Sequence, residues 1–188
     1  MSTNPNFHKL RELIIQEHGV LNSLWMNLIH TQFANVELLK EFKKLLELHT
    51  ANEENLLFAE MLKHKELNEG GPFCVLYYDD HMCHRPKDRF YNLFKQDVPQ
   101  RESLDLFAKN KSPLDIPIED HSVLITLVDR LILQNYPKEL ESELISSLQN
   151  IMHKHHEKEE TCFLKMCEAV LKDSSVEMIL NNWSHFTS

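Results

Sequence analysis

Two segments about a hundred residues apart in the chain carry the same arrangement of histidine and glutamate. Residues 49–58 begin with His49, place Glu53 four positions later with a second glutamate directly after it, and end in an apolar pair. Residues 155–164 repeat this order. Positions four apart lie on one face of a helix, one turn above the other. Each segment can therefore direct an imidazole nitrogen and a carboxylate oxygen at a single point.

Each half of the chain also has a single histidine on an apolar stripe, about 30 residues before the His/Glu pair. His18 and His121 stand where a leucine would be expected, and unpaired polar groups on a buried face are costly. Helices that face one another would bring all these side chains together. We therefore predict a metal centre inside a helical bundle, with the ligands His18, His49, Glu53, His121, His155 and Glu159.

The second His/Glu pair can be read in two registers, because His155/Glu159 and His156/Glu160 have the same spacing. Alignment of the two repeated segments selects His155, and so does the apolar stripe that precedes it. The competing stripe contains a glutamine. We expect His155 and Glu159 to be the ligands and keep His156 and Glu160 as the alternative. The second glutamate of each segment, Glu54 or Glu160, could also orient a ligand histidine from outside the ligand set.

The spacing of apolar residues predicts four long helices. A turn at residues 135–137 separates the third from the fourth, with Pro137 in the first turn of the latter. The pattern from Ser174 to Glu177 predicts a capping box at the start of a short last helix. The expected ranges of the long helices are about 6–33, 36–67, 118–134 and 137–172.

Residues 70–117 break the helical pattern and are expected to form a long irregular connection. They contain a Gly-Gly-Pro sequence and five of the seven prolines, which interrupt helices. His81 or His84 could reach the centre as a fifth nitrogen ligand, or the connection could cap the bundle end with both histidines at the surface. A zinc site of these histidines with Cys74 and Cys83 is a further alternative, although the spacing does not match the usual C-x-x-C knuckles.

Composition limits the classes of protein to which the chain can belong. Its 188 residues suit one domain, and the formal charge of −9 without a basic tract excludes nucleic acid as an expected partner. No apolar run approaches the ~18 residues that a membrane span needs, so no membrane partner is expected. The four cysteines include no C-x-x-C pair. We expect a cytoplasmic protein with reduced thiols.

The order of these motifs resembles the hemerythrin-like (HHE cation-binding) domain family. The resemblance rests on the two repeated segments and on the sequences around His18 (His-Gly-Val-Leu) and His121 (Glu-Asp-His-Ser-Val-Leu), and it covers about residues 8–67 and 116–170. It implies an all-α, four-helix up-down bundle as a single domain over residues 1–188, with its core at about 8–67 and 116–172. The chain lacks the H-x-x-x-H and the final Asp ligand of oxygen-carrying hemerythrins, so reversible oxygen carriage is not implied.

The resemblance also implies a cofactor and a function. The cofactor would be two iron ions with an oxo or hydroxo bridge, although imidazole and carboxylate ligands also suit other divalent metals. The implied function is the binding of, or reaction with, a small ligand such as oxygen, peroxide or nitric oxide, or the handling of iron. The alternatives are a di-iron peroxidase or oxygenase and a bundle that holds zinc or another metal in a regulatory role. The oligomeric state is left open.

Overall fold

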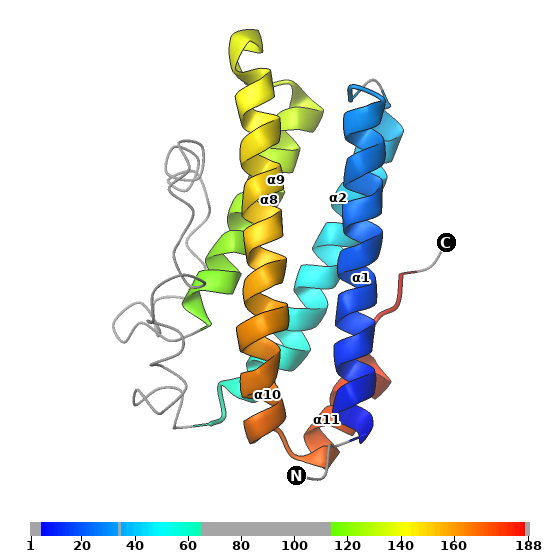
Figure 1. The fold of residues 1–188 in the computed structure, drawn as a ribbon, viewed down its shortest axis with the longest axis vertical. Coiled ribbons are helices and arrows are strands. Elements are labelled where there is room, and N and C mark those ends of the chain that lie inside the picture. Colours follow the sequence, from blue (N-terminus) through cyan, green and yellow to red (C-terminus); the bar gives the residue numbers. More distant parts are fainter. Residues whose placement is uncertain (1–4, 34, 65–113, 187–188) are drawn as a thin grey trace.

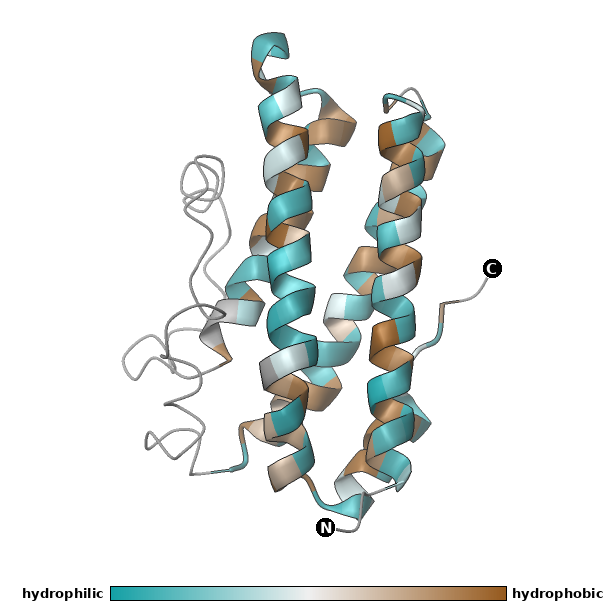
Figure 2. Cartoon of the chain, in the orientation of Figure 1, coloured by the Kyte–Doolittle hydropathy of each residue, from teal (hydrophilic) through white to brown (hydrophobic). Residues whose placement is uncertain are grey.

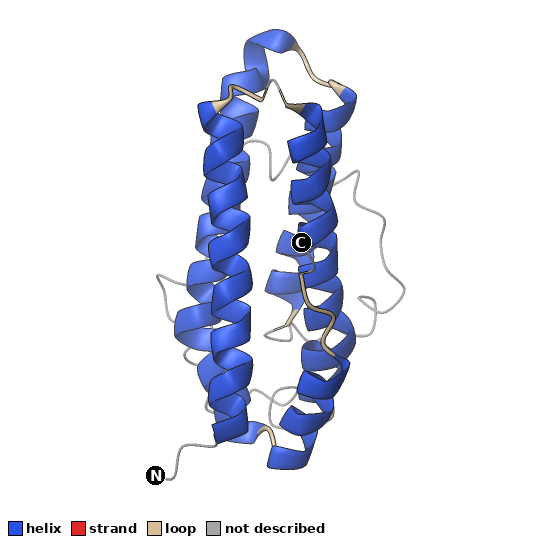
Figure 3. Cartoon of the chain, turned by 90° about the vertical axis from the view of Figure 1, so that its right-hand side faces the viewer, coloured by secondary structure: helices blue, strands red, loops and turns tan. Residues whose placement is uncertain are grey.

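The computed structural model describes residues 5–33, 35–64 and 114–186 (Figure 1). These residues form helices joined by turns, and no strand occurs among them (Figure 3). The prediction of an all-α fold is thus confirmed for this part of the chain. The main helices are α1 (Pro5–His30), α2 (Val36–Asn52), α8 (Asp115–Leu133), α9 (Glu141–Lys158) and α11 (Asp173–Asn182).

The long helices run side by side, as Figures 1 and 3 show from two directions. α1 packs on α2, α2 on α8, and α8 on α9, while α11 packs on α1. The outward side of α9 is mainly hydrophilic (Figure 2), as expected for a helix with one face in the interior. Within the described residues, none of the helices combines the length and the apolar character that crossing a membrane requires.

Both α2 and α9 change to π-helix at the glutamate of the repeated motif. α2 continues into η1 (Glu53–Phe58) and then α3 (Ala59–Met61), and α9 continues into η4 (Glu159–Phe163) and then α10 (Leu164–Val170). Short π segments inside α-helices are rare and are frequent at functional sites. Their occurrence at equivalent positions extends the sequence repeat to the backbone.

The π segment changes which residues face the interior. Continuing the α-helical stripe past Glu53 predicts Leu56 and Glu60 on the buried face, but the buried residues are Leu57, Phe58 and Met61. The expectation was wrong because hydrogen bonds from i to i+5 add a residue to the turn. The inward face therefore moves by about one position after the glutamate.

Some predicted helix ends differ from the structure. α8 begins at Asp115, and Pro137 precedes a 3₁₀ turn, η3 (Lys138–Leu140), instead of lying in the first turn of α9. The predicted capping box is wrong: α11 begins at Asp173 without a side-chain cap. The hydroxyl of Ser175 instead donates to Glu60 Oε1 over 2.7 Å.

The connection predicted over residues 70–117 lies outside the described residues up to residue 113. His81 and His84, with the alternative zinc site, fall in that stretch. The structure therefore does not test whether either histidine approaches the centre.

Buried apolar side chains form two clusters with the motif residues between them. One cluster includes Leu21, Trp25 and Phe42, and the other includes Ile14 and Phe58. His18 lies on α1 between Ile14 of one cluster and Leu21 of the other. The polar side chains thus occupy an interior layer that is closed above and below by apolar packing.

Candidate metal centre

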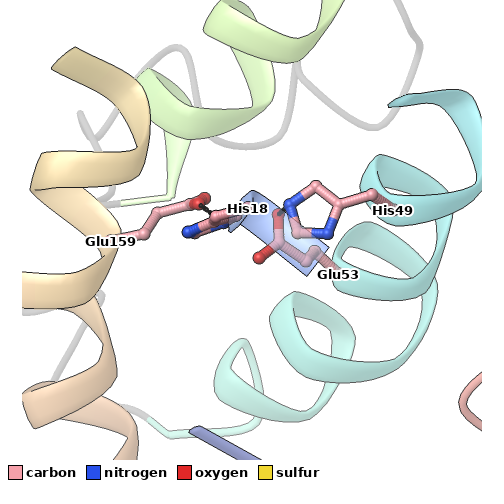
Figure 4. Close-up of side chains that lie close together, drawn as sticks. All are labelled: His18, His49, Glu53 and Glu159. Atoms are coloured by element: carbon pink, nitrogen blue, oxygen red, sulfur yellow. Dashed lines mark ion pairs between the residues drawn. The ribbon is translucent and has the colours of Figure 1, made fainter. Parts of the chain in front are cut away.

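The six predicted ligands lie together in the interior. Each of them is at most 1% exposed. They form two groups of four, and in each group one ligand atom of every residue lies within 4.8 Å of the others. Figure 4 shows the first group converging from α1, from the end of α2 and the start of η1, and from the start of η4. The groups are His18, His49, Glu53 and Glu159, and Glu53, His121, His155 and Glu159.

Glu53 and Glu159 belong to both groups, and each lies beside one histidine of each group. Glu53 Oε2 is 3.5 Å from His49 Nε2 and 3.2 Å from His121 Nε2. Glu159 Oε2 is 3.2 Å from His18 Nε2, and its Oε1 is 3.3 Å from His155 Nε2. This is the arrangement that two carboxylates need to bridge a pair of cations.

The spacing of ligand nitrogens in the second group suits a common ion. His121 Nε2 and His155 Nε2 are 3.0 Å apart. Two nitrogens bound at about 2.1 Å and about 90° to each other would lie about 3.0 Å apart. The two imidazoles therefore already have the separation of neighbouring ligands.

The inner atoms of the centre lack hydrogen bonds within the described residues. All four carboxylate oxygens of Glu53 and Glu159, and Nε2 of His18 and His49, have no hydrogen-bond partner there. Leaving a buried polar group unsatisfied costs about 1–3 kcal/mol, and more when it is charged. Cations bound between these atoms would satisfy them, so the residues present fit a metal site.

The outer nitrogen, Nδ1, of each ligand histidine faces a carboxylate. A carboxylate accepts a hydrogen bond from the Nδ1–H, which leaves the Nε2 lone pair for the centre. Three of the contacts are at hydrogen-bond distance, and the fourth is a longer contact of 3.6 Å. The pairs are His18–Glu160 at 2.7 Å, His49–Glu17 at 2.9 Å, His121–Glu54 at 3.0 Å and His155–Asp120 at 3.6 Å.

These outer pairs follow one rule in both halves of the chain. In each half, the acidic residue just before the stripe histidine (His18 or His121) contacts the histidine of the His/Glu pair in the same half. Glu17, for example, contacts His49. The second glutamate of each repeated segment contacts the stripe histidine of the other half, as Glu54 contacts His121. Glu54 and Glu160 thus take the orienting positions considered from the sequence.

Glu17 and Asp120 were missed as parts of the centre by sequence reasoning. Their signal was their place directly before His18 and His121. Asp120 is fully buried and also forms an ion pair with Lys158, which is itself buried. Trp183, from the other end of the chain, donates its indole N–H to Glu17 Oε1 over 2.9 Å.

The residues of the alternative register, His156 and Glu160, lie outside both groups of candidate ligands. Glu160 contacts the outer nitrogen of His18 and is in neither group of four. His156 is buried, and its ring stacks on His18 with centroids 3.8 Å apart and an angle of 8° between the planes. Neither ring nitrogen of His156 has a hydrogen-bond partner among the described residues.

The charges of the centre shift the pKa of its own groups. Burial lowers the pKa of His18, but the close contact with Glu159 and the hydrogen bond with Glu160 raise it to about 9. Burial likewise lowers the pKa of His121, and Glu159 and Glu53 raise it to about 9. Burial raises the pKa of Glu159, yet the charge of His155 and the close contacts with His121 and His18 hold it well below its usual value. The carboxylates thus favour the protonated form of His18 and His121, whereas burial lowers the pKa of His155.

Comparison of the chain with protein-family models, with curated proteins and with solved structures gives no match in any of the three.

Proposed function

We propose that the chain is a hemerythrin-like protein, a four-helix up-down bundle that holds two metal ions between its helices. The observation that carries this proposal is the pair of buried four-residue groups that share Glu53 and Glu159. One ion would be held by His18 and His49, the other by His121 and His155, with both carboxylates common to the two ions.

The donor set suits a hard or borderline metal such as iron. It consists of four imidazole nitrogens and four carboxylate oxygens, which suit iron, manganese or zinc. Burial and the nearby carboxylates raise the pKa of the Cys167 thiol well above its usual value, so this cysteine supplies no thiolate to attract a softer metal. Two six-coordinate ions need about twelve bonds, and these residues supply eight. The remaining positions would accept water, a bridging oxygen and one small ligand such as oxygen, peroxide or nitric oxide.

The protein's own contribution is orientation and exclusion of water. Carboxylates fix the tautomer of the ligand histidines, and the apolar clusters close the layer on both sides. When bound, the iron pair would supply binding or reduction of the small ligand. We propose a binding or sensing role first and keep a di-iron peroxidase or oxygenase as the alternative.

Metal content tests the proposal directly. Protein stripped with EDTA and reloaded anaerobically with Fe²⁺ should hold two ions per chain by elemental analysis. Glu53→Gln should lose most of both ions, because this carboxylate is common to the two positions. The control is Glu47→Gln on the same helix, where the side chain is 46% exposed and pairs with Lys43. Absence of stoichiometric metal in the wild type would refute the proposal.

The same assay decides the register. His155→Ala should reduce the metal content, whereas His156→Ala should keep two ions per chain. His153→Ala, an exposed position on the same helix, controls for loss of a histidine as such. Loss of metal in the His156 variant alone would move the ligand set to the alternative register. Addition of nitric oxide to the iron-loaded protein should then change its absorption spectrum if a position for a small ligand is open.

A further inference from the structure

The C-terminal segment, residues 173–186, is attached to the helices that carry the candidate centre. Its buried residues Val176, Ile179 and Trp183 belong to the apolar cluster that includes Ile14 and Phe58. α11 packs on α1 and on η1, and Figure 1 shows it beside the start of α1. The attachment joins residues more than a hundred positions apart in the chain.

Two of the polar contacts of this segment reach residues directly next to predicted ligands. Trp183 donates to Glu17, the neighbour of His18. The side chain of Asn52, the neighbour of Glu53, forms two hydrogen bonds with the backbone of Ser184, at 2.7 and 3.1 Å. Because both contacts are at least partly buried, they hold the segment in one position relative to the centre.

Glu17 connects the segment to a ligand through its two oxygens. Oε1 accepts from Trp183 Nε1 at 2.9 Å, and Oε2 accepts from His49 Nδ1 at 2.9 Å. Glu17 is 3% exposed, His49 is fully buried and Trp183 is 4% exposed. Water therefore has little access to replace any of the three, and the indole fixes the rotamer of the carboxylate that orients His49.

We propose that Trp183 and Glu17 are positioning residues for His49, and that docking of the C-terminal segment is coupled to metal binding at the His18/His49 position. This inference rests on the proposed function. Without the indole N–H, Glu17 can rotate, and His49 loses the acceptor that keeps its Nε2 directed at the centre. Loss of an orienting partner of a metal-ligating histidine lowers metal affinity by about 10–100-fold. By linkage, metal bound there stabilises docking of the segment to the same degree.

The alternative is that Trp183 only fills the apolar cluster. The variant Trp183→Phe separates these roles, because it keeps an aromatic side chain but removes the N–H donor. Ser175→Ala is the matched control, since it removes another hydrogen bond of the same segment, to Glu60, which is not a ligand. Glu17→Gln replaces the carboxylate between Trp183 and His49 with an uncharged amide of the same size.

Titration of the stripped protein with Co²⁺, followed by its visible absorption, measures the affinities of the two positions and their spectra. We expect Trp183→Phe to lower the affinity for one of the two Co²⁺ ions by about 10-fold or more and to change the absorption bands of that ion. Ser175→Ala should leave both affinities and both spectra unchanged. The double variant Glu17→Gln/Trp183→Phe should be no weaker than Glu17→Gln alone, because both changes interrupt one connection. Amide hydrogen exchange in residues 173–186 should slow when Co²⁺ is added to the wild type.

Two results would overturn the inference. If Trp183→Phe lowers only the melting temperature of the metal-free protein and leaves both Co²⁺ affinities within about 3-fold of the wild type, the residue is packing alone. If the effects of Trp183→Phe and Glu17→Gln on the Co²⁺ affinity are fully additive, the two residues do not act through one connection. Both outcomes leave the proposed function intact. Only a wild-type protein that takes up no Co²⁺ and no Fe²⁺ would refute the proposed function as well.

Discussion

Protons should take the place of metal ions in the stripped protein. The pKa of His18 and that of His121 are each raised to about 9, because the carboxylates around them outweigh the effect of burial. In the unfolded chain a histidine has a pKa of about 6.5. From pH 6.5 to 9 the folded, metal-free protein therefore holds up to two protons that the unfolded chain does not. The stability they contribute is fully present below pH 6.5 and is lost as the pH rises through 9.

The size of the effect follows from linkage. Each proton bound only in the folded state changes the free energy of unfolding by about 1.4 kcal/mol per pH unit. For two protons, raising the pH from 7 to 8.5 should lower the stability of the stripped protein by up to about 4 kcal/mol. This is a large part of the roughly 5–15 kcal/mol that holds a domain folded. Urea unfolding followed by circular dichroism, with EDTA present, measures the change.

Metal binding should release the same protons. Calorimetric titration with Zn²⁺ in two buffers of different ionisation enthalpy should give close to two protons per chain at pH 7.5 and fewer as the pH approaches 10. The variant Glu160→Gln should release fewer protons, because the pKa of His18 falls when it loses that acceptor although Glu159 remains. A proton lost from metal-bound water would not depend on Glu160. A stability that is flat or rises between pH 7 and 8.5 would refute the reasoning.

Three further predictions concern single side chains. Lys158→Met should destabilise the stripped protein by about 3–5 kcal/mol in urea, because it leaves a buried carboxylate unpaired, whereas Lys154→Met, whose ion pair is exposed, should cost less than about 1 kcal/mol. Phe58→Ala should leave a cavity in the layer below the centre and cost about 3–5 kcal/mol, measured by thermal unfolding. His156→Phe should keep the stack on His18 and remove two unpartnered nitrogens, so the stripped protein should be at least as stable as the wild type in the same assay.

The convergence of the motif residues could be read from the sequence because helical spacing is regular. A histidine and a glutamate four positions apart share one face wherever a helix forms. The apolar stripe before His155 indicates which face of that helix is buried. Helical spacing also places Ile14, Leu21, Trp25 and Leu28 on the same stripe as His18, and all four are buried. Neither placement required knowledge of how the helices cross.

The π segments could not be read in this way. Their sequence, such as Glu53–Phe58, has the composition of an ordinary helix, and its geometry depends on which side chains the neighbouring helices bury. Contacts between distant parts of the chain were equally hidden. Trp183 lies 166 positions from Glu17, and no local pattern indicates that its indole would meet that carboxylate.

The repeat in the chain produces two equivalent halves of the centre, but their outermost partners differ. The carboxylate behind His49 accepts a hydrogen bond from a neutral indole, whereas the carboxylate behind His155 is paired with the ammonium of Lys158. A charged acceptor makes an imidazole a stronger donor to a cation than a neutralised one does. The two proposed metal positions would therefore differ in affinity although their ligands are the same.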